Sequence, residues 1–279
     1  MTERRHFRSE SCPSRETGAL GVTVEIGGIP ISLRGGDPDF CGLIEQRYAG
    51  FVNPKAQPAF EFEFDLDSPA EPSNEDARVF KKGFVWFFER GDFRAAWDVR
   101  SRRGRVRQSP NPYSLDTVLR IAHTLVLAGE GGFLIHAASA IRDGRAFLFS
   151  GVSGAGKTTM ARLAPPDADV LTDEISYVRR CKRGYRAYGT PFAGELARVG
   201  ANLSAPLDTL YFLVQGPENR VEPVSPSDAA RALLRHILFF ACDRDLVQRV
   251  FDAALAFVSS VNVAKLVFTP DSRAWELIQ

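Results

Sequence analysis

Apolar and polar residues alternate along much of the first hundred residues, which is the pattern of strands with one buried face. Residues 60–66 are Phe-Glu-Phe-Glu-Phe-Asp-Leu, with an apolar side chain at every second position. Residues 22–26 and 29–33 are separated by Gly27 and Gly28, and such a glycine pair predicts a two-residue hairpin. Further elements are expected as a short helix over 39–48 and as strands over 79–89, over 93–99 and near 105–107. This region therefore predicts a small sheet-rich domain.

Apolar residues three and four positions apart predict helices in the rest of the chain. Residues 114–128 have this spacing, with Ser114 as a candidate N-cap and His123 as a core residue rather than a ligand. Nearer the C-terminus, Ser225 is expected to cap a helix that runs to about 240, and Asp243 to cap another. Strands are expected over 133–141, 145–150, 168–171, 208–214 and 263–269. This mixture of strands and helices predicts an α/β domain.

Length and composition are those of an ordinary globular protein with two domains. The chain has 279 residues, of which 44% are hydrophobic and 25% are charged, and domains usually contain about 100–200 residues. The patterns divide the chain into a disordered polar tail over 1–18, a sheet-rich α+β domain over 19–112 and an α/β domain over 113–279.

The charge distribution gives no reason to expect a nucleic acid or a membrane as a partner. The formal net charge is +1 at pH 7. The arginines between Arg94 and Arg107 are interpreted as the charged edge of a hairpin, which discourages edge-to-edge pairing, rather than as a phosphate-binding patch. We expect no signal peptide and no transmembrane span, because no apolar segment has the required length without charges or glycines.

Cysteine usage indicates a reducing environment. The four cysteines are widely separated in the sequence: Cys12, Cys41, Cys181 and Cys242. This spacing argues against a disulfide framework and against a zinc site. Because disulfide-free proteins are typical of the cytosol, we expect a cytoplasmic protein.

Candidate chemistry begins at residues 151–159, Gly-Val-Ser-Gly-Ala-Gly-Lys-Thr-Thr, which match the phosphate-binding pattern G-x-x-x-x-G-K-[ST]. A strand over 145–150 and a helix over 158–163 are expected on either side, as this motif requires. Lys157 would supply a charge for the outer phosphates, and Thr158 a hydroxyl for magnesium. The alternative is a glycine-rich turn that precedes a helix by chance. The predicted nucleotide-binding residues are Gly151, Val152, Ser153, Gly154, Ala155, Gly156, Lys157, Thr158 and Thr159.

His136 is expected beside this loop because of the turn that precedes the loop strand. Asp143 and Gly144 predict a two-residue hairpin turn. The register that this turn sets, continued along both strands, places His136 opposite Gly151. A histidine on a strand usually has no chemical role, but this register predicts a functional one.

Two adjacent carboxylates form the third part of the predicted site. Asp173 and Glu174 follow the strand at 168–171, sixteen and seventeen residues after Lys157. A strand end of this kind suits a magnesium ligand or a proton acceptor of the Walker-B type. If the strand persists, the two side chains point to opposite faces, so that one would meet the metal and the other a substrate hydroxyl or His136. The alternative is a solvated acidic turn.

Together, His136, the loop and the acidic pair resemble the catalytic core of HPr kinase/phosphorylase and its HPr-kinase-like relatives. The resemblance covers residues 114–279 and is sharpest over 133–178. It implies a P-loop core of the HPr kinase/phosphoenolpyruvate carboxykinase type with a mixed sheet, which binds ATP and Mg²⁺. It also implies that Thr158 and the acidic pair position the metal, and that Asp173, paired with His136, is the base.

The chain also departs from the family pattern. A Leu-Glu-Ile-Arg-Gly signature is missing downstream, and residues 189–195, Gly-Thr-Pro-Phe-Ala-Gly-Glu, stand near its place. The proline-arginine-glycine-arginine segment linked with the phosphorylase reaction is missing as well. HPr as substrate and phosphorylase activity are therefore not expected. Glu195 is either a further metal or substrate contact or an ordinary loop carboxylate.

The predicted function is an ATP-dependent kinase that transfers the γ-phosphoryl group to a hydroxyl. The first expectation for the acceptor is a serine of a peptide or small protein, such as a precursor peptide, and the second is a free small molecule. The alternatives are an ATP-binding regulatory module with little turnover and a relative whose loop is empty. The family is often oligomeric, so a homo-oligomer is compatible with the resemblance.

Overall fold

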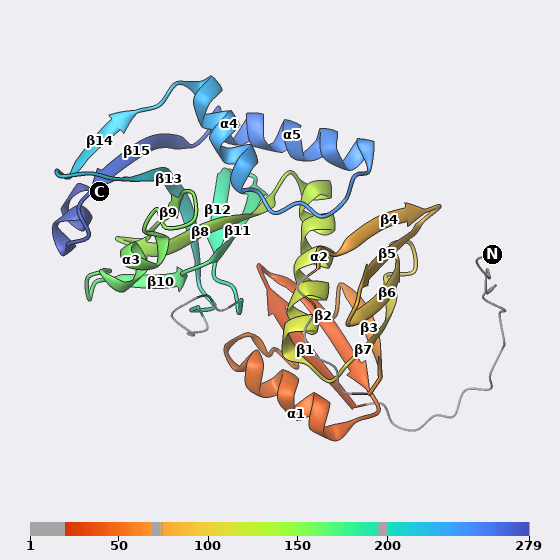
Figure 1. The fold of residues 1–279 in the computed structure, drawn as a ribbon. Helices are drawn as coiled ribbons and strands as arrows, with labels where there is room; N and C mark the ends of the chain where they lie inside the picture. The colour runs from red at the N-terminus through yellow and green to blue at the C-terminus, as the bar shows by residue number, and fades with distance from the viewer. Residues whose placement is uncertain (1–19, 69–72, 74, 193, 195–199, 279) are drawn as a thin grey trace.

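The computed structural model describes residues 20–68, 73, 75–192, 194 and 200–278. Over these ranges the chain is a mixed α/β protein with two mixed sheets and few helices (Figure 1). This confirms the predicted α/β class. The tail predicted over 1–18 lies outside the described residues, and the boundary between the two predicted domains stays a prediction.

Within the described residues, the first sheet has seven strands in the order β1-β2-β3-β7-β6-β5-β4. Strand β3 is parallel to both of its neighbours, and the other pairs are antiparallel. The strands are β1 (Leu20–Ile26), β2 (Ile29–Gly35), β3 (Phe60–Leu66), β4 (Arg78–Lys82), β5 (Val85–Arg90), β6 (Phe93–Asp98) and β7 (Arg103–Gln108). Helix α1 (Pro38–Arg47) and the 3-10 helix η1 (Ala49–Phe51) lie between β2 and β3 in the chain.

The hairpin predicted at Gly27 and Gly28 is confirmed, because Ile26 pairs with Ile29 and both glycines have a positive φ. The single strand predicted over 79–89 is wrong. The chain turns at Gly83, whose φ is +61°, and forms two strands, β4 and β5. A glycine permits this left-handed turn without the steric cost that a Cβ would bring.

The arginine-rich segment does not form a sheet edge as predicted, since β6 and β7 are interior strands. Its exposed side chains instead form ion pairs along the solvent face of the sheet. Arg105 lies 3.2 Å from Glu63 on the neighbouring strand β3, and Arg107 lies 2.6 Å from Asp67, which directly follows that strand. The charged side chains therefore lie on the solvent-exposed face of the first sheet and do not protect an edge strand.

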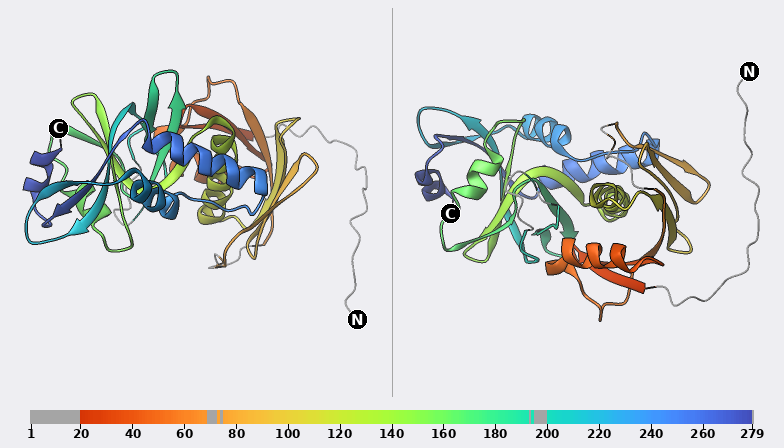
Figure 2. Two further views of the ribbon diagram at one scale, coloured as in Figure 1. Left: turned by 90° about the horizontal axis from the view of Figure 1, so that it is seen from above. Right: turned by 60° about the horizontal axis from the view of Figure 1, so that its bottom comes forward.

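Helix α2 (Pro112–Glu130) lies between the two sheets, as the right-hand view of Figure 2 shows along its axis. Its N-cap is Asn111, whose side chain accepts from the amide of Tyr113 at 2.8 Å. The prediction of Ser114 as the cap is wrong, because Ser114 lies inside the helix and its hydroxyl donates to Asp92. The buried face of α2 belongs to a hydrophobic core that contains side chains of both sheets.

In the part of the chain that the structure describes, the second sheet has eight strands. The path runs β10-β8-β11-β12-β13-β15-β14, and β9 pairs with both β8 and β13. The strands are β8 (Phe133–Arg142), β9 (Arg145–Ser150), β10 (Ala168–Thr172), β11 (Ile175–Cys181), β12 (Gly184–Tyr188), β13 (Ser204–Gln215), β14 (Arg220–Pro223) and β15 (Asn262–Phe268). The helices are α3 (Lys157–Arg162), α4 (Pro226–His236), α5 (Arg244–Val258) and the 3-10 helix η2 (Ser272–Leu277).

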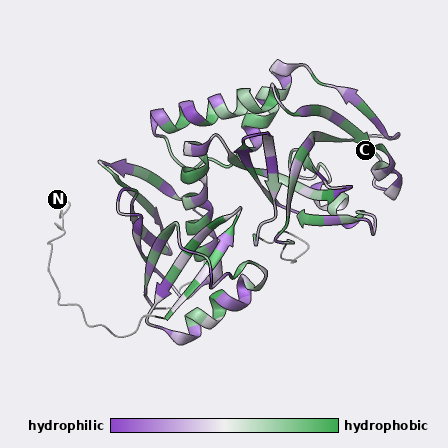
Figure 3. Cartoon of the chain, turned by 180° about the vertical axis from the view of Figure 1, so that it is seen from behind, coloured by the Kyte–Doolittle hydropathy of each residue, from purple (hydrophilic) through white to green (hydrophobic). Residues whose placement is uncertain are grey.

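Helix α5 carries hydrophobic and hydrophilic residues in alternation along its length (Figure 3). Its buried residues are Leu246, Val250, Ala253, Ala254 and Phe257, and Asp243 caps it as predicted. Among the described residues, no helix combines the length and the apolar character needed to cross a lipid bilayer.

The segments that pair with β8 change near His136, and the ladder is interrupted there on both edges of the strand. On one edge, β9 pairs with β8 as far as Ala137, and beyond that point Ile237 bridges Ile135. On the other edge, Thr172 pairs with Ser139 and Ile175 pairs with His136, so the two residues between them, 173 and 174, interrupt the ladder. Crevices at such points of changing strand order are common ligand sites in α/β proteins.

Candidate functional site

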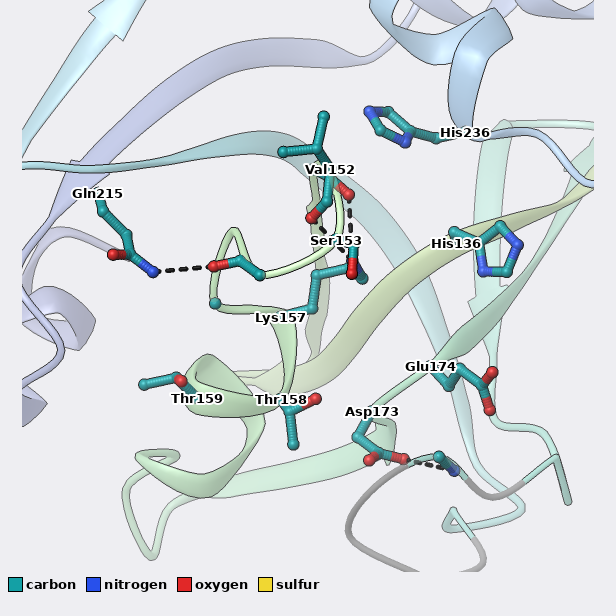
Figure 4. Close-up of a pocket in the computed structure, with 14 residues that line it drawn as sticks. His136, Val152, Ser153, Lys157, Thr158, Thr159, Asp173, Glu174, Gln215 and His236 are labelled. Atoms are coloured by element: carbon teal, nitrogen blue, oxygen red, sulfur yellow. Dashed lines mark hydrogen bonds between the residues drawn. The ribbon is translucent and has the colours of Figure 1, made fainter.

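A cavity of about 740 Å³ lies where β9 leaves the sheet and enters the glycine-rich loop (Figure 4). It brings together the loop, the predicted histidine and both predicted carboxylates. Its lining consists of His136, Gly151, Val152, Ser153, Gly154, Gly156, Lys157, Thr158, Thr159, Asp173, Glu174, Gly194, Gln215 and His236. Of the predicted loop residues, Ala155 is buried and does not line the cavity. Glu195 lies outside the described residues.

The loop has the backbone shape that its glycines allow. Gly154 and Gly156 have φ values of +77° and +108°. A Cβ on Gly156 would lie 2.5 Å from the ring of Phe268 on β15, so this position has both a conformational and a steric reason to be glycine. Strand β9 enters the loop and α3 follows it, as the motif predicts.

Lys157 lies at the start of α3 and turns back over the loop. Its Nζ donates to the carbonyl oxygens of Gly151 at 3.1 Å and Val152 at 3.3 Å. The side chain is thus held at the inner wall of the cavity. Gln215, at the end of β13, donates from Nε2 to the carbonyl of Gly154 at 2.8 Å and fixes the outer turn of the loop.

The predicted hairpin register is confirmed up to its last pair. Arg142 pairs with Arg145, and the ladder runs to Ala137 and Ser150. The predicted pairing of His136 with Gly151 is absent from the described ladder, because β9 ends at Ser150. Instead the hydroxyl of Ser150 donates to the carbonyl of His136 at 2.8 Å. His136 nevertheless lines the cavity together with Gly151.

The His136 ring is held in its neutral form. Withdrawal from bulk water lowers the pKa of His136, and the positive charges of Lys157 and Arg120 lower it further. An imidazole with a pKa below its usual value near 6.5 is unprotonated at neutral pH and can accept a proton.

The acidic pair divides between two sides of the cavity. Asp173 is buried, and its Oδ1 accepts from the amide of Gly194 at 3.2 Å. In Figure 4 Asp173 lies beside Thr158, whereas Glu174 lies below His136. Burial raises the pKa of Glu174, although the nearby guanidinium of Arg120 opposes this rise.

Arg120 is a site residue that the sequence did not reveal. It projects from α2, and its Nη2 lies 3.8 Å from Glu174 Oε2. Its guanidinium stacks 4.9 Å above the ring of Phe192, and among the described residues its Nε is buried without a hydrogen-bond partner. The available signal was a single arginine within an otherwise apolar stretch of helix.

His236 and Gln215 were also missed as site residues. His236 is the last residue of α4, and its ring lines the cavity near Val152 at the start of the loop (Figure 4). Burial lowers the pKa of His236, and Lys157 and Arg235 lower it further. Both residues come from elements distant in sequence from the loop, and only the tertiary fold brings them to it.

The candidate metal ligands lie beside the glycine-rich loop. Among the described residues, no group of three or more His, Cys, Asp or Glu side chains is arranged to hold a metal ion. The candidate ligands Thr158 and Asp173 both line the cavity, and Figure 4 draws them on the same side of Lys157.

The fold and the site thus define an α/β protein in which a glycine-rich strand–loop–helix opens into a cavity with histidine and acidic side chains. The chain belongs to the family described as SynChlorMet cassette protein ScmC, whose model matches residues 114–279. All residues that line the cavity lie within the matched range. No curated protein matches the chain.

Proposed function

We propose that the chain is an ATP-dependent kinase that transfers the γ-phosphoryl group to a hydroxyl, with a serine of a peptide or small protein as acceptor. The observation that carries this proposal is the shared cavity of the loop, His136 and the acidic pair. We further propose that residues 113–279 form a P-loop core of the HPr kinase/phosphoenolpyruvate carboxykinase type. The mixed sheet and the strand–loop–helix unit support this assignment.

The residues beside the loop fit a magnesium ion that accompanies the nucleotide. Mg²⁺ prefers oxygen ligands, and it commonly keeps water and phosphate oxygens beside one or two protein groups. The Thr158 hydroxyl and the Asp173 carboxylate are such oxygen donors, and both line the cavity. When bound, the ion would neutralise charge on the phosphate oxygens during transfer.

The loop and its lysine would hold the phosphates in place. The loop glycines expose backbone amides, and Lys157 lies close enough to exchange its loop carbonyl partners for phosphate oxygens. Positioning and charge neutralisation are the main contributions to phosphoryl transfer.

His136 and Glu174 occupy the wall that an acceptor would approach. In the proposed reaction the acceptor oxygen bonds to the γ-phosphorus while the bond from that phosphorus to the ADP oxygen breaks. The acceptor proton passes to the ring of His136, whose lowered pKa leaves it unprotonated and able to accept a proton. The resemblance implies Asp173 as the base paired with His136. Because Figure 4 shows Glu174 below His136 and Asp173 on the side of Thr158, we instead propose Asp173 as the metal ligand and Glu174 as the partner of His136.

The acceptor is best sought among the products of neighbouring genes. The family description speaks of a cassette protein, and a precursor peptide encoded in the same cassette would fit the predicted substrate class. A free small molecule is the second class to test.

The test measures nucleotide binding and phosphoryl transfer separately in His136→Ala and Asp173→Asn. Both variants are expected to retain ATP binding and to lose transfer by at least about 100-fold. His136→Ala removes the general base, and Asp173→Asn weakens the hold on the magnesium ion. Transfer is followed as ADP formation with the candidate acceptor and with water. The matched control is Asp169→Asn, an exposed carboxylate on β10, which should keep wild-type transfer.

Wild-type transfer rates in both site variants would contradict the roles proposed for His136 and Asp173. A wild-type protein that binds Mg·ATP but forms no ADP would favour the regulatory module, because such a module does not need a proton acceptor beside the γ-phosphate. Absence of any ATP binding would favour an empty loop.

A further inference from the structure

The cavity contains an imidazole that the proposed proton transfer does not use. His236 lies near Val152 at the start of the loop, and Figure 4 shows Thr158 and Asp173 on the other side of Lys157. A phosphate that extends from the loop toward His136 would therefore pass between the candidate metal ligands and the ring of His236.

The backbone around His236 is fixed by pairing with β8. Helix α4 ends at His236 because Ile237 adopts an extended conformation, with φ −64° and ψ 131°, and bridges Ile135. The amide of Leu238 then donates to the carbonyl of Leu134 at 2.9 Å. These contacts hold the ring at the point where the strand neighbours of β8 change.

The ring itself is also supported by the sheet. Phe212 on β13 lies with its ring centroid 6.1 Å from that of His236. The charged groups that act on the ring are Lys157 on α3 and Arg235 on α4, and His136 faces it from β8. These neighbours favour the neutral ring, and a neutral imidazole has one N–H donor to offer.

We propose that His236 donates a hydrogen bond to the γ-phosphate of bound ATP and so distinguishes ATP from ADP. This inference rests on the proposed function. The ring keeps its proton throughout transfer: its N–H contacts a non-bridging γ-oxygen while the bond to ADP breaks and the bond to the acceptor forms. A donor aimed at these oxygens stabilises the charge that they carry in the transition state.

The position of His236 favours recognition of the γ-phosphate over a purely structural role for its ring. The α- and β-phosphates lie against the loop amides in sites of this type. His236 lies on the side of Val152 that faces His136 (Figure 4), and the phosphate on the acceptor side is the terminal one. ADP lacks that group, and its affinity should not depend on His236.

The test compares the dissociation constants of Mg·ADP and of a magnesium complex of a non-hydrolysable ATP analogue. The full-length wild type, His236→Ala and His236→Gln are measured by calorimetry. Wild type should prefer the analogue, and His236→Ala should lose that preference by about ten- to hundredfold, which is the scale of a hydrogen bond to a charged group. ADP affinity should stay within about twofold of wild type, and His236→Gln, which keeps an N–H donor, should recover part of the preference.

Three results would overturn the inference, and they differ in what they say of the kinase. If the wild type binds ATP and transfers phosphate, but His236→Ala keeps the wild-type preference for the analogue over ADP, then His236 has no role in recognition and the kinase proposal stands. An equal loss of ADP and analogue affinity in His236→Ala indicates a structural role and has the same consequence. A wild type that binds neither nucleotide overturns both proposals.

Discussion

His123 lies on α2 with its ring fully buried, and its Nδ1 is 3.0 Å from the hydroxyl of Tyr177 on β11. Burial lowers the pKa of His123 to about 3. The predicted role as a core histidine is therefore confirmed. Because the unfolded chain binds a proton near pH 6.5 and the folded chain does not, this residue makes stability fall as the pH falls from about 6.5 toward 3.

We predict that His123→Gln weakens this dependence. Glutamine can keep a hydrogen bond to Tyr177 but does not titrate. Between pH 7 and pH 5 the wild type should lose on the order of 2 kcal/mol more unfolding free energy than the variant, measured by urea denaturation at both values. Equal losses in the two proteins would show that His123 does not supply the acid sensitivity.

Single site residues could be predicted from the sequence where they belong to a local motif or follow from one turn. The loop, its lysine and the carboxylates after β10 are all recognisable from the chain itself, and His136 follows from one turn. Arg120, Gln215 and His236 come from α2, β13 and α4. These three residues lie beside the loop because of long-range packing, which cannot be predicted from a local sequence pattern.

Among the elements, α3 is a short helix that depends on the C-terminal segment. Trp275 in η2 donates from its indole nitrogen to the carbonyl of Met160 at 3.0 Å. Arg142 donates in turn to the carbonyl of Trp275 at 2.9 Å. Since α3 carries Lys157 and Thr158, these bonds hold the candidate phosphate site against β8 and η2.

We predict that Trp275→Phe lowers the unfolding free energy by about 1–3 kcal/mol, because the buried carbonyl of Met160 loses its donor. The matched control is Trp97→Phe, since the indole nitrogen of the buried Trp97 has no hydrogen-bond partner among the described residues. Chemical denaturation should show the larger loss in Trp275→Phe. The reverse order would contradict a supporting bond at α3.

The accuracy of the predicted elements followed the strength of their local signals. Strand β3 matches its predicted range because its alternation is complete. Strands β11 and β12 were not predicted, since arginines interrupt their pattern. Helix α4 was predicted to run to about 240 but ends at His236, because pairing of Ile237 with β8 overrides the helical pattern.

For the molecule as a whole, α2 connects the first sheet to the cavity. Arg47 and Tyr48, at the end of α1, both donate to the buried carboxylate of Asp116 on α2. One turn further along the same helix, Arg120 contacts Glu174 in the cavity. A continuous hydrophobic core surrounds these polar contacts.

The first hairpin also touches the second sheet. The carbonyl of Gly27 accepts from Arg179 on β11 at 2.8 Å. The ring of Tyr177 packs so closely against Gly27 that a Cβ at this position would collide with it. The first sheet is thus fastened to the strands that border the candidate site, and its sequence alone gave no indication of this arrangement.

The most direct test of the proposed nucleotide site is a calorimetric titration of the protein with Mg·ATP. We predict saturable binding to the wild type and an affinity lower by at least about tenfold in Lys157→Ala, because a charge-assisted contact to the phosphates is lost. The matched control Lys182→Ala, at an exposed lysine between β11 and β12, should bind as the wild type does. Failure of the wild type to bind Mg·ATP, or equal affinity of the wild type and Lys157→Ala, would contradict the assignment of the loop as a nucleotide site.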